Sequence, residues 1–307
     1  MAPNVTILSG GVGGARTARA LSLAGFDLTV VVNVGDDQST HGVCVSPDLD
    51  TVLYTLAGVE GPDGWGLADD THRVMDTLAW LGADTTFRIG DRDLATNLYR
   101  TAALAAGRPL SAVTADLVEA YDVAATILPA TDDPVRTVVL TDAGRLSFQE
   151  YFVHRRHQDE VRDLVFEGSG DARPAPGVLE AVTDADLVVI GASNPPLSIW
   201  PILAVPGLTD AVANADIVLA VSPLIGGRAI KGPAHEVLAT LGLPPGNAGI
   251  VAAYDGLLTD LVVDTEDGAD RLAMSGPDLR VHVTNTRIAD ADPAMRFGRW
   301  LWDLVSA

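Results

Sequence analysis

The first segment of the chain, residues 5–32, reads VTILSGGVGGARTARALSLAGFDLTVVV and decides the fold. Two short runs rich in β-branched residues, Val5–Leu8 and Leu28–Val32, flank a glycine-rich turn and the alanine-rich stretch Ala15–Ala24, which has helical composition. A strand, a helix and a second strand in this order form a βαβ unit, whose two strands lie parallel. The segment therefore predicts a parallel sheet with a buried first strand.

The same alternation returns in the second half of the chain. Asp186–Ile190 and Ile217–Val221 are apolar runs of strand length, and each leads into a polar loop that contains proline. Between the two halves, helical periodicity marks three stretches: Asp69–Leu81, Leu94–Ala106 and Ser111–Tyr121. We therefore expect a Rossmann-like α/β core with a mainly parallel three-layer sheet, formed by residues 1–61 and 129–307, and a mainly helical insertion subdomain at 62–128.

The segment after the insertion alternates in the manner of strands. It contains a turn at Asp142–Arg145 and three candidate strands, Val135–Thr141, Leu146–Val153 and Val161–Glu167. A hairpin or meander of this kind pairs antiparallel. We expect it to extend the main sheet with some antiparallel strands.

The charge of the chain restricts its partners. The sequence has 41 acidic and 20 basic residues, which gives a formal net charge of −21. Such a surface repels nucleic acids and anionic lipids, so we expect neither as a partner. The single cysteine, Cys44, excludes an internal disulfide, and the apolar runs are far shorter than the ~20 residues of a membrane span. We expect a cytoplasmic protein that holds any anionic ligand with local amides, arginines or a cation.

The glycine loop after the first strand suits a phosphate. It reads Ser9-Gly10-Gly11-Val12-Gly13-Gly14-Ala15-Arg16 and leads from a strand into a helix. Backbone N–H groups and the positive end of a helix dipole then converge on one spot. The loop departs from the dinucleotide fingerprint, since Arg16 occupies the third glycine position and Asn33 the place of a ribose-binding acid. The alternative is that these glycines only permit tight packing of strand and helix.

Four aspartates follow the second strand, and their chemistry suits a divalent cation. They are Asp36, Asp37, Asp48 and Asp50. Carboxylates at the carboxyl end of a strand, beside a phosphate loop, are the hard oxygen ligands that Mg²⁺ takes together with water and substrate phosphates. Asp37, Asp48 and Asp50 are the candidate catalytic residues, as metal ligands or as the base that accepts a proton from an attacking hydroxyl. Alternatively, Asp48 caps a helix while Asp36 and Asp37 are turn residues.

Two further loops contain donors for a base, a ribose or a second phosphate. They follow the strands of the second half, at the edge where ligands bind in an open parallel sheet. The residues expected to bind nucleotide or phosphate are Ser9, Gly10, Gly11, Gly13, Gly14, Asn33, Ser193, Asn194, Pro195, Ser222, Pro223, Gly226, Gly227 and Lys231. The charged loop Arg88–Asp93 either closes over an acceptor or is a solvated turn.

Taken together, these motifs resemble the 2-phospho-L-lactate transferase family of coenzyme F-420 biosynthesis. The resemblance extends from Val5 to Tyr254 and rests on motifs that occur in register. They are Leu8–Arg16, Asn33–Asp37, Ser46–Val52, Gly90–Asp93, Phe148–Val153, Ser193–Pro195 and Ser222–Gly227. One departure is Asn97, where many relatives have a histidine.

The resemblance implies a Mg²⁺-dependent transfer. A guanosine diphosphate-linked three-carbon acid would give its phospho-acyl group, phosphoenolpyruvyl or 2-phospholactyl, to the ribityl hydroxyl of the deazaflavin Fo, releasing GMP and forming F-420-0 or its dehydro form. It implies that the glycine loop and the two serine-containing loops hold the guanosine diphosphate moiety, that Asp50 and Arg88 contact Fo, and that the protein is a homodimer. Composition typical of bacteria favours phosphoenolpyruvate.

Two other functions are weighed against this one. A sugar-nucleotide-binding regulator of the same superfamily shares the glycine loop, but Asp48, Asp50 and the Phe148–Val153 segment disfavour it. A nicotinamide-dependent oxidoreductase is disfavoured by Arg16 and Asn33. On the transferase hypothesis, Asp50→Asn is expected to cut turnover severely and leave the fold intact.

Overall fold

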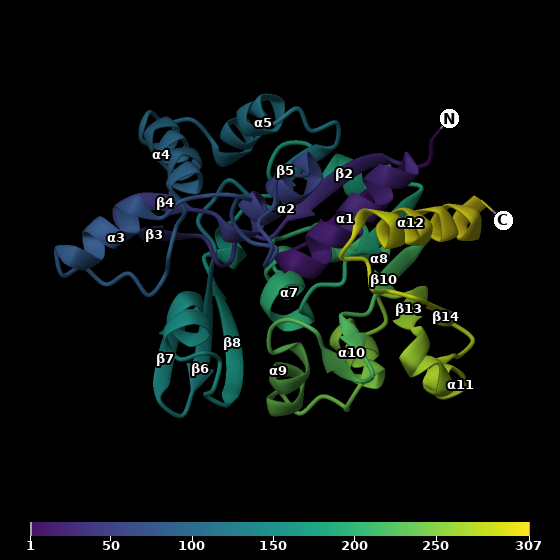
Figure 1. Ribbon diagram of the computed structural model, residues 1–307. Helices are drawn as coiled ribbons and strands as arrows, with labels where there is room; N and C mark the ends of the chain where they lie inside the picture. The colour runs from purple at the N-terminus through teal and green to yellow at the C-terminus, as the bar shows by residue number, and fades with distance from the viewer. Residues whose placement is uncertain (1, 307) are drawn as a thin grey trace.

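The computed structural model describes residues 2–306, and its centre is a wholly parallel sheet of seven strands (Figure 1). The strands are β1 (Asn4–Ser9), β2 (Asp27–Val32), β5 (Thr126–Pro129), β9 (Leu187–Ile190), β10 (Val218–Val221), β13 (Asp260–Asp264) and β14 (Arg280–Thr284). Their order across the sheet is β14-β13-β10-β9-β1-β2-β5. This is the doubly wound order, which reverses direction between β1 and β9. The predicted Rossmann-like fold is confirmed.

The central strands are buried on both faces, which explains their continuous apolar sequences. Leu8 of β1 pairs with Val31 of β2 on one side and with Ile190 of β9 on the other. All three side chains are fully buried. Because helices cover both faces of a parallel sheet, its strands need not alternate between apolar and polar residues.

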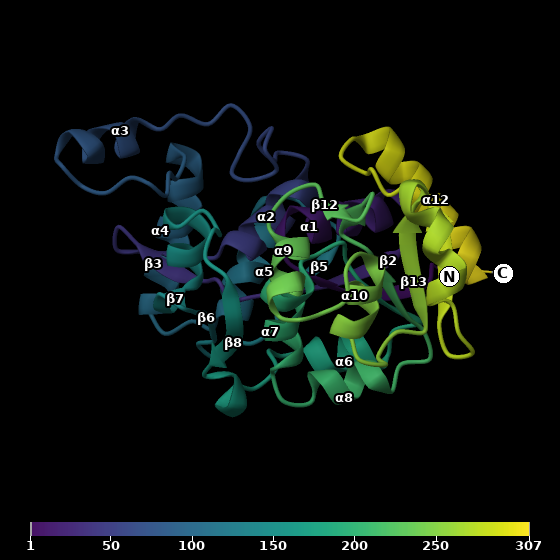
Figure 2. The same cartoon turned by 90° about the horizontal axis from the view of Figure 1, so that it is seen from below.

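Helices form a layer on each face of the sheet (Figure 2). On one face α1 (Gly11–Ala24) packs against α2 (Pro47–Ala57) and α12 (Ala291–Ser306). Right-handed crossovers from β9 to β10 place the helices that follow β9 on the other face. The remaining helices of the core are α6 (Val178–Thr183), α7 (Trp200–Leu203), α8 (Leu208–Ala213), α9 (Ala234–Thr240), α10 (Asn247–Ala253) and α11 (Arg271–Met274). Within the described residues, no helix is both long and apolar enough to cross a membrane.

The predicted helices of the insertion are present. They are α3 (Arg73–Trp80), α4 (Asp91–Ala105) and α5 (Leu110–Ala120). Leu110 and Leu117 of α5 belong to the main core, and β5 pairs with β2, so residues 126–128 lie in the central sheet and not in a helical segment. The hairpin of β3 (Gln38–Thr40) and β4 (Val43–Val45) packs with the insertion around Met75. The division into a core and an insertion subdomain stays a prediction.

The antiparallel strands form a sheet of their own. β6 (Arg136–Thr141), β7 (Gly144–Ser147) and β8 (Val161–Glu167) are ordered β7-β6-β8. The expectation that they extend the main sheet is wrong, because β5 occupies the edge beside β2, while β6 pairs with β7 and β8. The expected strand Leu146–Val153 ends at Ser147, after which the chain forms a π-helical turn at Glu150–His154.

Several short elements complete the fold. The hairpin of β11 (Leu224–Ile225) and β12 (Arg228–Ala229) follows β10. A π-helical turn at Pro195–Ile199 follows β9, and short 3₁₀ helices lie at Ser169–Asp171 and Thr265–Asp270. The loops that leave β1, β9 and β10 therefore meet at the carboxyl edge of the sheet, where doubly wound proteins bind ligands.

Candidate active site

A cavity of about 1040 Å³ opens at the carboxyl edge of the sheet. Its walls come from the loops after β1, β9, β10 and β14, the first turns of α2, and segments 61–72 and 87–93 of the insertion. A further wall comes from Phe148–Val153. The cavity therefore lies at the point where the strand order reverses, and it brings together most of the motifs singled out in the sequence.

The glycine loop forms the floor of the cavity and is closely packed. Gly10, Gly11 and Gly13 line the cavity. A Cβ added at Gly13 would lie 1.9 Å from the backbone oxygen of Ala192. The Ser193 Oγ accepts a hydrogen bond from the Gly10 amide at 3.2 Å and donates to the Gly10 carbonyl at 2.8 Å. Tight packing, the alternative reading of these glycines, is thus present, and it accompanies exposure of the loop to the cavity.

Asp48 connects the glycine loop to the end of β2. Its Oδ1 accepts a hydrogen bond from the Gly11 amide at 2.6 Å, and its Oδ2 accepts one from the Asn33 amide nitrogen at 2.9 Å. The same nitrogen of Asn33 donates to Asp36 Oδ1 at 3.3 Å. Burial raises the pKa of Asp48 to about 6, although both hydrogen bonds oppose the shift. Burial, and then repulsion from Asp48 and Asp37, raise the pKa of Asp36.

Asp37 and Asp50 point to different partners. Asp37 does not line the cavity; its Oδ2 accepts a hydrogen bond from Ser46 Oγ at 2.9 Å, and burial raises its pKa to about 7. Asp50 lines the cavity and forms a buried ion pair with Arg100 of α4. Burial raises the pKa of Asp50, while Arg100 opposes that shift.

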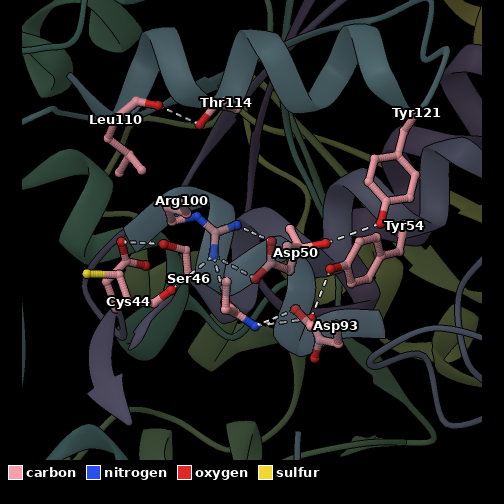
Figure 3. Close-up of polar contacts among 12 residues, drawn as sticks. Cys44, Ser46, Asp50, Tyr54, Asp93, Arg100, Leu110, Thr114 and Tyr121 are labelled. Atoms are coloured by element: carbon pink, nitrogen blue, oxygen red, sulfur yellow. Dashed lines mark hydrogen bonds and ion pairs between the residues drawn. The ribbon is translucent and has the colours of Figure 1, made fainter. Parts of the chain in front are cut away.

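The Asp50–Arg100 pair belongs to a buried polar network between α2 and α4 (Figure 3). Arg100 Nη1 donates to Asn97 Oδ1 at 2.7 Å, and Asn97 in turn donates to the Asp93 carbonyl at 2.9 Å. The Tyr54 hydroxyl donates to Asp93 Oδ1 at 2.9 Å. Asn97, the position that departs from the family pattern, therefore orients Arg100 from within α4 and does not line the cavity.

The aspartates fit a magnesium ion that keeps part of its water shell. Among the side chains that the structure describes, no three of His, Cys, Asp or Glu gather at one point that could hold a metal ion, so the four predicted ligands do not form one cluster. Asp36 and Asp48 are brought together by Asn33 and both line the cavity. Mg²⁺ is commonly held by one or two carboxylates, with water and substrate phosphates as its other ligands. The donor set therefore suits Mg²⁺ at Asp36 and Asp48.

The serine-containing loops contribute only in part. Ser193 and Asn194 after β9, and Ser222 and Pro223 after β10, line the cavity. Pro195 does not line it, nor do the predicted glycines of the second loop. The amides of those glycines donate to a carboxylate of the protein itself, Gly226 to Asp267 Oδ2 at 3.0 Å and Gly227 to Asp267 Oδ1 at 2.8 Å.

Of the remaining predicted binding residues, Arg88 and Lys231 line the cavity with exposed side chains, and Asn33 does not line it. Arg88 Nη2 pairs with Asp76 Oδ1 at 2.7 Å, and both side chains are exposed. Lys231 donates from Nζ to the Asp63 carbonyl, and its ammonium lies 5.1 Å from the centre of the Trp65 ring. Ser9 and Gly14 are buried behind the loop and do not line the cavity.

Sequence reasoning missed three parts of this site. Arg16 and Gln149 line the cavity, as does the loop Thr286–Asp290 after β14. Arg16 follows Val12 by one helical turn, a spacing that places both on the same face of a helix. The sequence could therefore have indicated that Arg16 lies on the side of the helix that carries Val12 of the glycine loop. Arg100 gave no such signal, because it lies inside a helix far along the chain from Asp50.

The cavity, with carboxylates and glycine amides at the switch point of a doubly wound sheet, defines a protein that handles a phosphorylated small molecule. The family model described as "2-phospho-L-lactate transferase CofD" matches residues 5–285. A phosphoenolpyruvate transferase of Streptomyces griseus subsp. griseus is 40% identical, with 98% of each chain covered. A 2-phospho-L-lactate transferase of Methanopyrus kandleri is 37% identical, with 98% of this chain and 97% of that protein covered.

These matches place the chain in a family. It belongs to the 2-phospho-L-lactate transferase family and is a transferase, so that prediction from the sequence is confirmed. A solved structure of a UPF0052 family protein from Bacillus halodurans has a TM-score of 0.68 and 16% identity, and the match covers 98% of this chain and 99% of that one. At this identity the likeness supports the fold alone.

Proposed function

We propose that this transferase moves a phosphoenolpyruvyl or 2-phospholactyl group from a guanosine diphosphate-linked donor to the ribityl hydroxyl of Fo in coenzyme F-420 biosynthesis. The observation that carries this proposal is the pairing of Asp36 and Asp48 beside the glycine loop, inside a cavity of about 1040 Å³. Ligand sites of ordinary size occupy roughly 300–1,000 Å³, so this cavity has room for a large donor beside an acceptor. The relatives named phosphoenolpyruvate transferase favour phosphoenolpyruvate as the acid.

The reaction forms one bond and breaks one. The terminal oxygen of Fo bonds to the phosphorus that bears the three-carbon acid, and the bond from that phosphorus to the bridging oxygen of the diphosphate breaks. GMP leaves with the bridging oxygen, and the hydroxyl proton passes to a carboxylate. The product is a phosphodiester, and no covalent intermediate with the protein is required.

The residues of the cavity divide the work. Asp36 and Asp48 would hold Mg²⁺, which would supply positive charge to the diphosphate. Asp50 lines the cavity and is fixed by Arg100, so it suits contact with the acceptor hydroxyl. Arg88 at the mouth would contact the deazaflavin ring system, and Ser193, Asn194 and Ser222 offer donors to the nucleotide.

The experiment supplies purified protein with Fo, Mg²⁺ and, in turn, guanylylated phosphoenolpyruvate, 2-phospholactate and phosphoglycerate. GMP and an Fo phosphodiester are expected with at least one acid, and neither is expected after chelation of the metal. Binding of a UDP-sugar without binding of Fo would instead favour the regulator.

Asp48→Asn tests the carrying observation. The variant keeps the size of the side chain and removes the charge, so we expect turnover to fall about a hundredfold or more. Asp163→Asn is the matched control, because Asp163 is exposed on β8 and does not line the cavity. Turnover of Asp48→Asn within a fewfold of that control would remove Asp48 from the mechanism.

We also propose that the protein acts as a cytoplasmic homodimer, as its resemblance to the family implies. Light scattering of the purified protein at micromolar concentration is expected to give twice the chain mass of 32.0 kDa. A mass of one chain at all concentrations would contradict this part of the proposal.

A further inference from the structure

The basic side chains that line the cavity differ in whether the protein itself supplies them with a hydrogen-bond or ion-pair partner. Three of the four arginines and lysines that line it are engaged by the protein itself: Arg88 with Asp76, Arg287 with Glu266, and Lys231 with the Asp63 carbonyl. Arg16 has no hydrogen bond or ion pair with any residue that the structure describes, and its Nε is buried without an acceptor. Arg16 is therefore the cavity cation whose charge the described protein leaves unmatched.

Arg16 is half-buried, and its buried Nε–H calls for an acceptor. A guanidinium presents five N–H donors and no acceptor, so each buried N–H needs an acceptor from the protein or from a ligand. A buried donor without an acceptor destabilises a protein, and a charged donor more so. In a chain with a net charge of −21, a carboxylate partner for this arginine would be readily available, yet none contacts it in the described structure.

The position of Arg16 determines where such an anion would lie. Arg16 is in the second turn of α1, and helical side chains lean toward the N-terminus of their helix. Val12, one turn earlier, also lines the cavity. The guanidinium is thus directed along the cavity wall toward the glycine loop.

A diphosphate beside the glycine loop would require a positive charge from the protein. The Gly11 amide, a group that a phosphate at the start of α1 would use, donates instead to Asp48 Oδ1 at 2.6 Å. Asp36, Asp48 and Asp50 add negative charge to the same cavity. These carboxylates would repel a diphosphate unless a cation lay next to it. Mg²⁺ at Asp36 and Asp48 would neutralise only the part of the diphosphate that faces those two residues.

We propose that Arg16 binds the donor directly, by donating to non-bridging oxygens of its diphosphate. This rests on the proposed function and assigns the diphosphate subsite to α1. An arginine gives two parallel hydrogen bonds to a phosphate, which a single lysine ammonium does not reproduce. Arg16 would therefore set both the affinity for the donor and the orientation of the phosphorus that is attacked.

The test measures binding of GDP, with Mg²⁺ present, by isothermal titration calorimetry. Arg16→Gln is expected to raise the dissociation constant tenfold to a hundredfold, by roughly the loss of one charged hydrogen-bonding pair. The dissociation constant of Arg16→Lys is expected to lie between those of the wild type and Arg16→Gln. Arg19→Gln is the matched control, since Arg19 is on the same helix, pairs with Glu60 at 3.4 Å and does not line the cavity. Thermal unfolding confirms that each variant is folded.

A second probe, inorganic pyrophosphate with Mg²⁺, separates this proposal from the proposed function. If the wild type binds pyrophosphate but not GDP, and Arg16→Gln loses pyrophosphate, the Arg16 assignment stands while the guanosine donor fails. Equal GDP affinity for the wild type and Arg16→Gln overturns the assignment. This holds even if Arg16→Gln binds phosphoenolpyruvate more weakly, because Arg16 would then contact the carboxylate of the acid and not the diphosphate. Absence of binding of either probe to the wild type overturns it too.

Discussion

Two glycine loops of this protein have similar sequences and different physical requirements. Gly10–Gly14 follows β1, and Gly226–Gly227 follows β10, at the same edge of the same sheet. A glycine amide in each loop donates to an aspartate, Gly11 to Asp48 and Gly227 to Asp267. Only the first loop lines the cavity, so a glycine-rich turn after a strand does not by itself identify a ligand site.

The glycines differ in what a side chain would meet. A Cβ at Gly13 would overlap the backbone oxygen of Ala192 at 1.9 Å. A Cβ at Gly227 would meet no described atom within 4 Å, but the residue has φ of +73°, which favours glycine. Gly13 therefore requires glycine for close packing, whereas Gly227 requires it for its backbone conformation alone. Gly11 of the first loop shares the second requirement, with φ of +64° and no described atom within 4 Å of an added Cβ.

Gly13→Ala should produce the largest effect. The methyl group would have to displace the backbone after β9, and we expect a loss of roughly 5 kcal/mol or more, or no folded protein. Gly227→Ala should lose only about 1 kcal/mol, the cost of a left-handed alanine. Urea denaturation of both variants measures the difference, and equal losses would remove the distinction between the loops.

Asp50→Asn extends the comparison to an acid that is paired with a cation. Removing its charge leaves Arg100 buried and uncompensated, so we expect a loss of about 3 to 5 kcal/mol in unfolding free energy. The expectation from the sequence that this variant keeps its fold stays a prediction, and the ion pair adds a loss of stability to it. The double variant Asp50→Asn with Arg100→Met is expected to regain stability but not turnover. If Asp50→Asn alone were as stable as the wild type, the ion pair would contribute little to stability.

Asp267→Asn tests the acid of the second loop. The amide oxygen can accept from one glycine amide, and the other loses its acceptor, which costs about 1 kcal/mol. Because Asp267 does not line the cavity, turnover should stay within a fewfold of the wild type. A hundredfold loss of turnover with normal stability would mean that the second loop takes part in catalysis.

Titration should show effects of opposite sign at two aspartates. Burial, and then repulsion from Asp50, raise the pKa of Asp93 to about 7, so its stabilising contribution is present below pH ~4 and is lost as the pH rises through 7. Burial alone would raise the pKa of Asp260, but hydrogen bonds from His282 and Arg280 outweigh it and lower the pKa to about 2. The contribution of Asp260 is therefore present above pH ~4 and is lost as the pH falls through 2.

At about 1.4 kcal/mol per unit of pKa shift, the contribution of Asp93 is on the order of a few kcal/mol, and that of Asp260 is smaller because its pKa shifts less. Asp93→Asn should make the decline in unfolding free energy between pH 4 and 7 shallower, because Asp37 and Asp48 also contribute to it. Asp260→Asn should make the decline between pH 4 and 2 shallower. Thermal melts across this range measure both. A decline that persists unchanged in its variant would assign it to other groups.

The parallel core was predictable because its signals are local. Val5–Val32 contains the whole βαβ unit, and apolar runs of strand length marked β9 and β10. The place of the antiparallel strands was not predictable, because whether β6 joins the main sheet depends on which strand occupies its edge. That is settled by the long-range pairing of β5 with β2.

The candidate site was predictable to the extent that loops at one sheet edge must converge. That rule brought Asp48, Ser193 and Ser222 to one cavity with the glycine loop, while Asn33 contacts Asp48 from outside the cavity lining. It could not assign the aspartates to different partners, because Asp50 pairs with Arg100 of α4, whose position depends on how the insertion packs. It also could not show that Gly226 and Gly227 are satisfied by Asp267, which follows β13.

Lys231 is the only lysine in the sequence, and it lines the cavity, where its ammonium contacts the Asp63 carbonyl and lies over the Trp65 ring. Apart from the amino terminus, an amine-selective reagent therefore has a single target, and that target lies at the entrance to the substrates. A fluorophore attached there, next to an indole that quenches many dyes, would report in real time when the entrance opens or fills.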